Sequence, residues 1–284
     1  MITNQLTDWL ELWRELSETR NWRFDPEKGG EKDHWQKKAS AYSRRVQERW
    51  QQPDTTRDFL KTVLLNHPES TLLDIGAGTG NWAIYLSPYA SKITALEPSD
   101  GMRSVLLENL QNSSVTNVEV VNGKWPEAET GIYDFTLCSH AMYGISDFQA
   151  MVEKMNKTAR NTCFLLIRAP LLSDPLAQIS QAVWGQPNDS PNFSVAYNAL
   201  QQLGIYANVL FEENPHPHPR IFESPEMAFQ EIKKRFHLSD ESKFDPLIRR
   251  ILSENLQQVG KTLVLNMAVK VGLIYWKPAE ISCF

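Results

Sequence analysis

The sequence predicts an α/β protein built on a doubly wound parallel sheet. From residue 71 onward, short apolar runs alternate with stretches of helical periodicity, a pattern typical of parallel strands covered by helices on both faces. A glycine-rich turn at residues 76–80 follows the first apolar run directly. The chain has 284 residues, enough for one large domain or two small ones.

Two or three amphipathic helices are expected before residue 71. Apolar residues recur at helical spacing over 6–16 and again over 35–46, with a break at Pro26, Gly29 and Gly30. Packing of helices against a neighbouring core is the common use of Trp, and the alternative is that one or two of these side chains wall a substrate pocket. Five of the nine Trp residues lie here: Trp9, Trp13, Trp22, Trp35 and Trp50.

The middle of the chain predicts the sheet itself. Helices between its strands are expected at 81–90, 101–111 and 147–159, and the last carries apolar residues on one face. We therefore take residues 71–170 as the core. The predicted strands are 71–75, 92–96, 118–121, 133–138 and 162–168.

The pattern after Pro170 is less regular. It predicts a polar loop at 214–220, a strand at 206–211, helices at 225–236 and 246–258, and a final strand at 267–276. Additions of this kind usually close a pocket. We expect an N-terminal helical cap segment at 1–70, a cap insertion on the substrate side at 171–260, and a final strand within 261–284 that completes the core sheet.

Composition limits the class of protein. The chain has 29 Lys and Arg against 34 Asp and Glu, a net charge of -5 with no long run of one sign, which argues against binding nucleic acid or a membrane through a basic surface. Neither a secretory signal nor a transmembrane segment is predicted. Three cysteines, Cys138, Cys163 and Cys283, are too few to staple the chain and indicate a reducing compartment. We expect a cytoplasmic protein.

The glycine turn and an acidic residue predict a nucleoside-containing ligand. Glycines between a strand and a helix let the backbone approach a ligand closely. Glu97 follows Gly76 by 21 positions, at the end of the second strand, where a carboxylate can accept hydrogen bonds from both ribose hydroxyls. A dinucleotide fingerprint needs its third glycine at position 81, which is Asn81. The spacing therefore speaks against NAD.

Residues 74–80, Asp-Ile-Gly-Ala-Gly-Thr-Gly, together with Glu97 resemble the first motif and the second-strand acid of the class I S-adenosylmethionine-dependent methyltransferases. Residues 96–102, Leu-Glu-Pro-Ser-Asp-Gly-Met, resemble the small-molecule branch of type 11/25-like enzymes. The likeness covers 72–168. It implies a Rossmann-like methyltransferase sheet, S-adenosylmethionine as cofactor and S-adenosylhomocysteine as product.

The resemblance implies roles for single residues. Asp74 lies near the methionine ammonium, Glu97 holds the ribose, and Met102 covers the adenine. Many family members have an acid after the third strand, where this chain has Asn122-Gly123-Lys124-Trp125, so the adenine contact stays open between Asn122, the Lys124 backbone and Trp125. Trp125 is equally suited to packing. The expected cofactor-binding residues are Asp74, Gly76, Ala77, Gly78, Gly80, Glu97, Pro98, Met102, Lys124, Trp125, Ser139 and, from an N-terminal helix, Tyr42.

Methyl transfer from a sulfonium is an in-line displacement, so much of its rate can come from positioning. Candidates for a base lie just after the fourth strand, in Cys-Ser-His-Ala-Met-Tyr-Gly at 138–144. His140 is the first candidate, as a base, a substrate hydrogen-bond partner or a support for the cofactor loop, and Tyr143 is the second. Arg168 ends the fifth strand and suits either an acidic substrate group or a surface salt bridge.

Two specialised branches and a metal site are disfavoured. Enzymes that methylate amino groups of DNA bases or glutamine carry Asn or Asp before Pro-Pro and an aromatic, unlike residues 139–142. Metal-dependent catechol-type enzymes need oxygen ligands after the fifth strand, which ends Ile-Arg-Ala-Pro at 167–170. His216 and His218 fit a proline-stiffened loop better than a metal site. No metal is expected.

The sequence therefore predicts a methyltransferase for a small-molecule acceptor, acting as a monomer or homodimer. Two alternatives stay open: a non-catalytic subunit that binds S-adenosylmethionine, and a protein methyltransferase. A nucleotide-dependent oxidoreductase is disfavoured by the glycine spacing.

Overall fold

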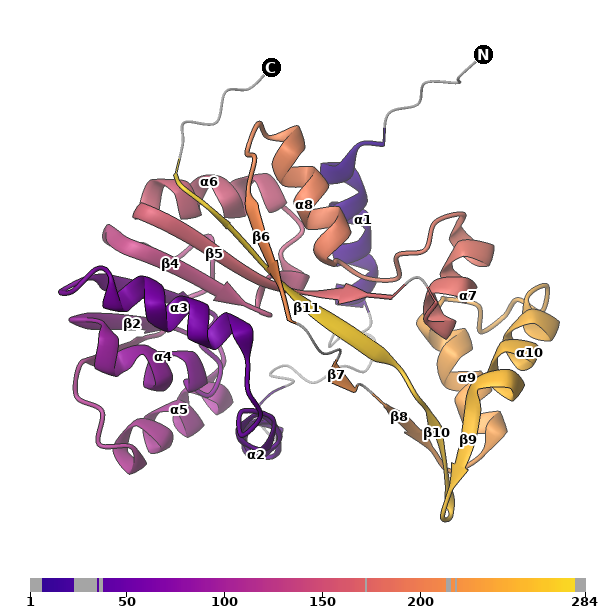
Figure 1. Ribbon diagram of the computed structural model, residues 1–284. Coiled ribbons are helices and arrows are strands. Elements are labelled where there is room, and N and C mark those ends of the chain that lie inside the picture. Colours follow the sequence, from indigo (N-terminus) through magenta and orange to yellow (C-terminus); the bar gives the residue numbers. More distant parts are fainter. Residues whose placement is uncertain are drawn as a thin grey trace.

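The structure, a computed structural model, describes residues 7–22, 35, 38–171, 173–212, 216–217 and 219–278. A twisted central sheet runs through its middle (Figure 1). The strands of this sheet are β1 (Thr71–Ile75), β2 (Lys92–Leu96), β3 (Val118–Val121), β4 (Tyr133–Ser139), β5 (Ala159–Pro170), β6 (Asn208–Phe211), β7 (His216–Pro217) and β11 (Ala268–Trp276).

The order of the strands is β3-β2-β1-β4-β5-β11-β6, with β7 paired to β11. Strands β1 to β5 pair with one another in parallel, whereas β11 is antiparallel to both β5 and β6. The chain reverses its direction of travel across the sheet between β1 and β4, and ligands bind at such a switch point in open α/β sheets. The predicted doubly wound α/β fold is confirmed.

Helices cover both faces of the sheet. On one face pack α3 (Thr55–Leu65), α4 (Asn81–Leu86) and α5 (Asp100–Asn112), which bury Leu60, Ala83 and Leu106 against the strands. On the other face pack α1 (Trp9–Trp22), α6 (Phe148–Thr158) and α8 (Phe193–Gln202). Figure 1 shows α1 and α8 side by side on that face, far apart in sequence.

A smaller unit lies beside the central sheet. It consists of α7 (Pro175–Trp184), α9 (Pro225–Arg235), α10 (Asp245–Asn255) and a second sheet, β8 (Arg220–Phe222), β10 (Thr262–Leu265) and β9 (Leu256–Val259), in that order. We call this unit the cap. Its buried residues, such as Phe229, Ile232 and Ile251, form a hydrophobic cluster of their own. Figure 1 shows the cap beyond the ends of β5 and β11.

The structure divides the segment 171–260, which the sequence predicts as one insertion. Helix α8 packs against β5, and β6 pairs with β11 at the edge of the central sheet. Only the remainder of the segment belongs to the cap. The domain limits 1–70, 71–170, 171–260 and 261–284 stay a prediction.

Secondary structure also departs from the prediction after residue 170. The expected helix 246–258 ends at Asn255, because residues 256–259 pair with β10 as strand β9. Helices α7 and α8 are absent from the sequence interpretation, since Gly185, Pro187 and Pro191 between them favour a loop. Part of the expected polar loop 214–220 pairs with β11 as β7.

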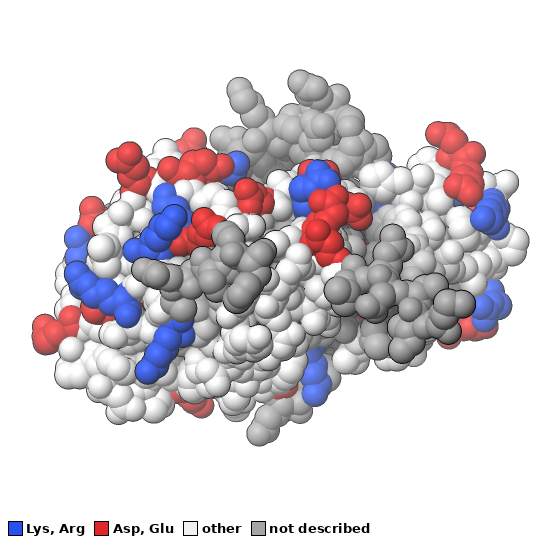
Figure 2. Space-filling view, turned by 90° about the horizontal axis from the view of Figure 1, so that it is seen from above, with Lys and Arg blue, Asp and Glu red and all other residues white. Residues whose placement is uncertain are grey.

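Basic and acidic side chains are interspersed over the face seen from above (Figure 2). No single-sign field covers that face, which is the arrangement that disfavours non-specific attraction to polyanions. Within the described ranges, no helix combines the length and apolar character needed to cross a bilayer.

Candidate functional site

Strands β1, β2 and β4 end side by side at the switch point. Ile75 pairs with Leu96 on β2 and with Cys138 on β4. The residues that follow are Gly76, Glu97 and Ser139, so the register brings the glycine loop, the acidic residue and the loop after β4 to one edge of the sheet. Three segments that are distant in sequence thus meet there, as predicted.

The glycine loop needs its glycines. Gly76, Gly78 and Gly80 all have positive φ, at 68°, 58° and 84°, a region that side chains with a Cβ rarely adopt. A Cβ on Gly76 would lie 2.3 Å from the Cβ of Ala141. The loop therefore packs directly against the backbone that follows β4.

Glu97 holds the glycine loop to the second strand. Its Oε2 accepts a hydrogen bond from the Gly78 amide at 2.8 Å and its Oε1 accepts one from the Ser99 amide at 2.9 Å. Only 6% of Glu97 is exposed. Each carboxylate oxygen thus accepts one backbone hydrogen bond, Oε2 from the glycine loop and Oε1 from the segment before α5.

Asp74, the last but one residue of β1, is buried with an unsatisfied oxygen. Its exposure is 1%, and its Oδ2 has no hydrogen-bond partner among the described residues. Burial, together with the nearby charge of Glu97, raises the pKa of this carboxyl to about 7. A buried acceptor without a donor is costly, so a cationic donor bound here would satisfy it.

These elements line one cleft, which we call the first cleft. Its remaining wall comes from α2 (Ala39–Arg49), whose residues Tyr42, Val46 and Arg49 face the glycine loop at helical spacing. The predicted residues that line it are Tyr42, Asp74, Gly76, Ala77, Gly78, Ser139 and His140.

Sequence reasoning missed other lining residues. They are Val46, Arg49, Trp50, Thr79, Asn81 and Trp82. The spacing of Tyr42, Val46 and Arg49 on one helix face was the available signal. Trp50 packs edge to face on Trp82, with ring centroids 5.0 Å apart, and the indole of Trp82 donates to Ser139 Oγ at 2.9 Å. One of the N-terminal Trp residues thus does wall a pocket.

His140 and Tyr143 form a hydrogen-bonded pair at the edge of the first cleft. His140 has a positive φ of 55°, and its Nδ1 lies 2.8 Å from the Tyr143 hydroxyl. The amide of Arg168 donates to the same hydroxyl at 3.1 Å. Tyr143 is buried and does not line the first cleft, so it can act only through His140.

Helix α1 supports this pair. The Trp13 indole is fully buried and donates to the Ile145 carbonyl at 2.8 Å, and Asn21 donates to the Gly144 carbonyl at 2.9 Å. The ring of Trp13 packs on Phe148, with centroids 4.4 Å apart. The packing role predicted for the N-terminal Trp residues is thus seen for Trp13.

Other predicted cofactor residues lie outside the first cleft. Met102 is buried near the start of α5, and Pro98 is exposed. Lys124 is exposed and pairs with Glu127 at 3.4 Å. Trp125 is a core residue, because its indole donates to the Met151 carbonyl at 3.3 Å and its exposure is 4%. Gly80 and Glu97 shape the loop without lining the opening.

The described residues contain no group of three or more His, Cys, Asp and Glu side chains close enough to hold a metal ion. Burial raises the pKa of both the Cys138 and the Cys163 thiol to about 12, so neither is a reactive thiolate. His218 and Cys283 lie outside the described residues, as does the predicted break at 26–30.

Comparison with solved structures shows the fold alone. YjhP from Escherichia coli is 11% identical with a TM-score of 0.51, covering 94% of this chain and 99% of that protein. A putative methyltransferase from Bacillus halodurans is 13% identical with a TM-score of 0.50, covering 77% and 99% of the two chains.

Among curated sequences, an uncharacterised protein of Haemophilus influenzae is 25% identical over 63% of this chain and 66% of its own length. The demethylmenaquinone methyltransferase of Oceanobacillus iheyensis is 26% identical over 37% of this chain and 45% of its own length. The chain thus spans less than two thirds of these curated relatives. Residues 42–230 match the family model described as a methyltransferase domain. The chain belongs to this family, which confirms the predicted resemblance to the class I S-adenosylmethionine-dependent methyltransferases.

Proposed function

We propose that the protein transfers a methyl group from S-adenosylmethionine to a small-molecule acceptor without a metal ion. The observation that carries this proposal is the buried, unsatisfied Oδ2 of Asp74 in the first cleft. A carboxylate there needs a cationic donor, and the α-ammonium of the cofactor is one.

The residues of the first cleft fit the other parts of the cofactor. Arg49 has no carboxylate partner within the described part of the chain and suits the methionine carboxylate. The open space at Gly78 allows a ligand to approach the backbone closely. Beside the cleft, Glu97 stands directly after β2, where a carboxylate can accept hydrogen bonds from ribose hydroxyls. When bound, S-adenosylmethionine supplies an electrophilic methyl group on a sulfonium, and the protein supplies position.

His140 orients the acceptor in this proposal. Tyr143 Oη accepts the amide hydrogen of Arg168, so its own hydrogen is available to His140 Nδ1. In this proposal Oη donates to Nδ1, so that the imidazole hydrogen stands on Nε2. His140 then acts as a hydrogen-bond donor toward an acceptor oxygen or nitrogen, and serves as an orienting group rather than a base.

Two features support a small-molecule acceptor. The cap lies beside the carboxyl edge of the sheet, as additions that close small-molecule pockets do. The curated relatives include a demethylmenaquinone methyltransferase and a probable cobalt-precorrin-6B C(15)-methyltransferase, which is 30% identical over 33% of this chain. Both names refer to small acceptors.

Calorimetric titration with S-adenosylmethionine and S-adenosylhomocysteine tests the cofactor. We expect micromolar binding that weakens at least tenfold in Glu97→Ala, because hydrogen bonds to a charged group contribute about 1.5–3 kcal/mol. Glu119→Ala is the matched control, since Glu119 is exposed on β3 and pairs with Lys92 at 2.6 Å. Absence of binding in folded protein would end the proposal.

Transfer of a labelled methyl group to a panel of small molecules tests the reaction. Cofactor binding without transfer to any of them would favour the alternative of a non-catalytic subunit. Transfer to protein alone would favour a protein methyltransferase.

A further inference from the structure

A second cleft lies between the end of β5 and the cap. Three guanidinium groups reach it from three different elements: Arg168 near the end of β5, Arg220 at the start of β8 and Arg235 at the end of α9. Its apolar wall includes Leu176 and Met267. The carboxylates of Asp174 and Asp189 and the polar residues Asn188 and Ser190 also line it.

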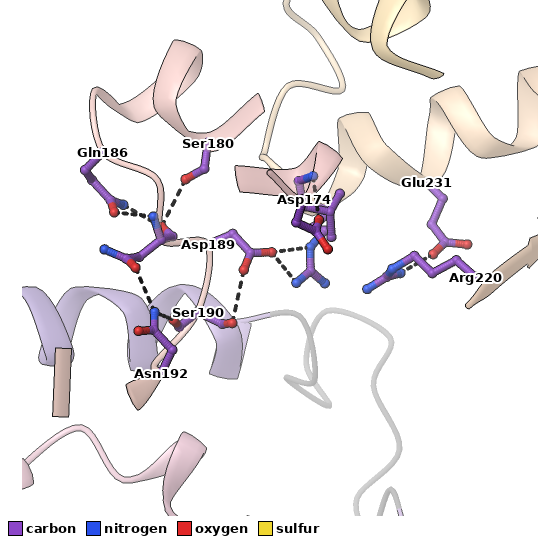
Figure 3. A network of polar contacts seen from close by, with 11 residues as sticks. Asp174, Ser180, Gln186, Asp189, Ser190, Asn192, Arg220 and Glu231 are labelled. Atoms are coloured by element: carbon purple, nitrogen blue, oxygen red, sulfur yellow. Dashed lines mark hydrogen bonds and ion pairs between the residues drawn. The ribbon is translucent and has the colours of Figure 1, made fainter. Parts of the chain in front are cut away.

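The cations of the second cleft are unequally neutralised. Arg235 is held by Asp189, whose Oδ2 accepts from Nε at 2.6 Å and also from a terminal nitrogen. Arg220 pairs with Glu231 at 2.7 Å, yet its Nε is buried with no partner. Figure 3 shows these two contacts, with Asp189 on the loop between α7 and α8. Arg235 is therefore committed to structure, whereas Arg220 has a donor to spare.

Arg168 has no carboxylate partner anywhere in the described ranges. Its guanidinium lies 4.5 Å from the centroid of the Tyr143 ring, a cation–π contact that uses none of its hydrogen-bond donors. An arginine half-buried in a cleft without a counter-ion is a natural place for an anion.

The surroundings of the second cleft are crowded with positive charge. Burial, together with the charges of Arg168 and Arg235, lowers the pKa of Arg20 to about 10. Burial and the charge of Arg235 also lower the pKa of Arg220. The neighbouring guanidinium groups thus add to the effect of burial, and a bound anion would oppose both.

The second cleft connects to the first through a short chain of contacts. Arg168 packs on Tyr143, the Tyr143 hydroxyl lies 2.8 Å from His140 Nδ1, and His140 lines the first cleft. The buried Tyr143 side chain thus stands between the guanidinium of Arg168 and the imidazole of His140.

We propose that the methyl acceptor is an acidic small molecule whose oxyanion, a carboxylate or a phosphate, binds Arg168 and Arg220 while its apolar part lies against Leu176 and Met267. This inference rests on the proposed methyltransferase function. Guanidinium forks match both oxyanions, and the experiment separates the two.

The test measures binding rather than turnover, by calorimetry and ligand-observed NMR on protein saturated with S-adenosylhomocysteine. The probes are phenylacetate, phenyl phosphate and the neutral phenylacetamide, with inorganic phosphate alone. The variant is Arg168→Gln, which breaks no internal ion pair. Its control is Arg160→Gln, at the opposite end of β5, where the side chain is 60% exposed.

We expect one of the two anionic aryl probes to bind at least tenfold more tightly than phenylacetamide, and Arg168→Gln to remove that advantage while Arg160→Gln keeps it. The anionic aryl probe that binds more tightly identifies the oxyanion. If inorganic phosphate alone binds as tightly as phenyl phosphate, the site recognises a phosphate group. Equal binding of the neutral and anionic probes, no binding of either anion, or an unchanged Arg168→Gln overturns the inference.

Failure of the proposed function is read separately in the same samples. Loss of S-adenosylhomocysteine binding with anion binding intact would count against the methyltransferase proposal. Retained cofactor binding with no anion preference would count against the acidic acceptor alone.

Discussion

Glu97 Oε2 and the Gly78 amide lie 2.8 Å apart and join the end of β2 to the glycine loop. A second hydrogen bond, from the Ser99 amide to Oε1 at 2.9 Å, ties the same carboxylate to the start of α5. One acidic side chain thus fixes two loops at the switch point before any ligand is present. Preorganisation of this kind reduces the ordering cost of binding.

The glycines of the loop should differ in how well they tolerate substitution by alanine. Gly76→Ala combines a positive φ with a Cβ contact of 2.3 Å to Ala141, whereas Gly78→Ala meets nothing within 4 Å. We expect Gly78→Ala to cost about 1–2 kcal/mol of unfolding free energy and Gly76→Ala clearly more. Urea unfolding compares the two, and equal losses would show that the loop can shift away from Ala141.

Asp74 should make stability depend on pH. Its pKa is raised from 3.8 to about 7, so the folded state binds the proton more tightly than the unfolded state does. The contribution of Asp74 to the free energy of unfolding is full below about pH 4 and is lost as pH rises to about 7. The free energy of unfolding of Asp74→Asn should therefore rise relative to that of wild type between pH 4.5 and 7.5, by roughly 1–4 kcal/mol in urea unfolding.

Asp134→Asn is the matched control for that measurement. Although burial opposes it, hydrogen bonds from the Thr71 amide and hydroxyl hold the pKa of Asp134 below its usual value. The contribution of the Asp134 carboxylate to stability is present at neutral pH and lost as pH falls. The free energy of unfolding of Asp134→Asn should therefore fall relative to that of wild type as pH rises. The same sign in both variants would contradict the assignment for Asp74.

Tyr143→Phe tests the role of the phenol as a positioning residue. The change removes the hydrogen bond to His140 Nδ1 and leaves the walls of the first cleft intact. We expect kcat to fall about tenfold, about 1.4 kcal/mol, with the Kd for S-adenosylhomocysteine within twofold. Tyr206→Phe, at a tyrosine that is 83% exposed, should change neither value. A weaker cofactor Kd with normal kcat would place Tyr143 in the cofactor site instead.

The cap should depend on its own hydrophobic cluster. Ile232→Ala empties a fully buried position on α9, which typically costs 2–5 kcal/mol. Met227→Ala, on the same helix but 51% exposed, should cost less than about 0.5 kcal/mol. Urea unfolding gives both numbers. Because α9 does not line the first cleft, affinity for S-adenosylhomocysteine should stay within twofold in each folded variant.

The sheet was predictable because its strands are apolar runs between polar loops. The predicted limits of β1, β2 and β3 match the structure to the residue. Helices α7 and α8 were not predictable in the same way, since the Pro and Gly residues around them dominate the local signal. The end of α10 was missed because β9 forms by pairing with β10, a tertiary contact.

The first cleft was predictable where a motif specifies it. Asp74, Gly76 and Gly78 belong to one local pattern. Arg49 and Trp50 line the same cleft because α2 docks there, and no local pattern specifies where a helix docks. Trp125 shows the converse, since its position after the third strand suggested a ligand contact while its indole bonds to α6.

The cap elements α9, α10 and β8 to β10 enter the chain between β6 and β11, which remain neighbours with Phe211 opposite Gly272. Their hydrophobic cluster is separate from the two that cover the sheet. The segment between β6 and β11 can therefore change in length or composition during evolution without shifting the register that places Asp74 and Glu97. Descendants of one cofactor-binding scaffold can diverge in what they modify while inheriting the same source of the transferred group.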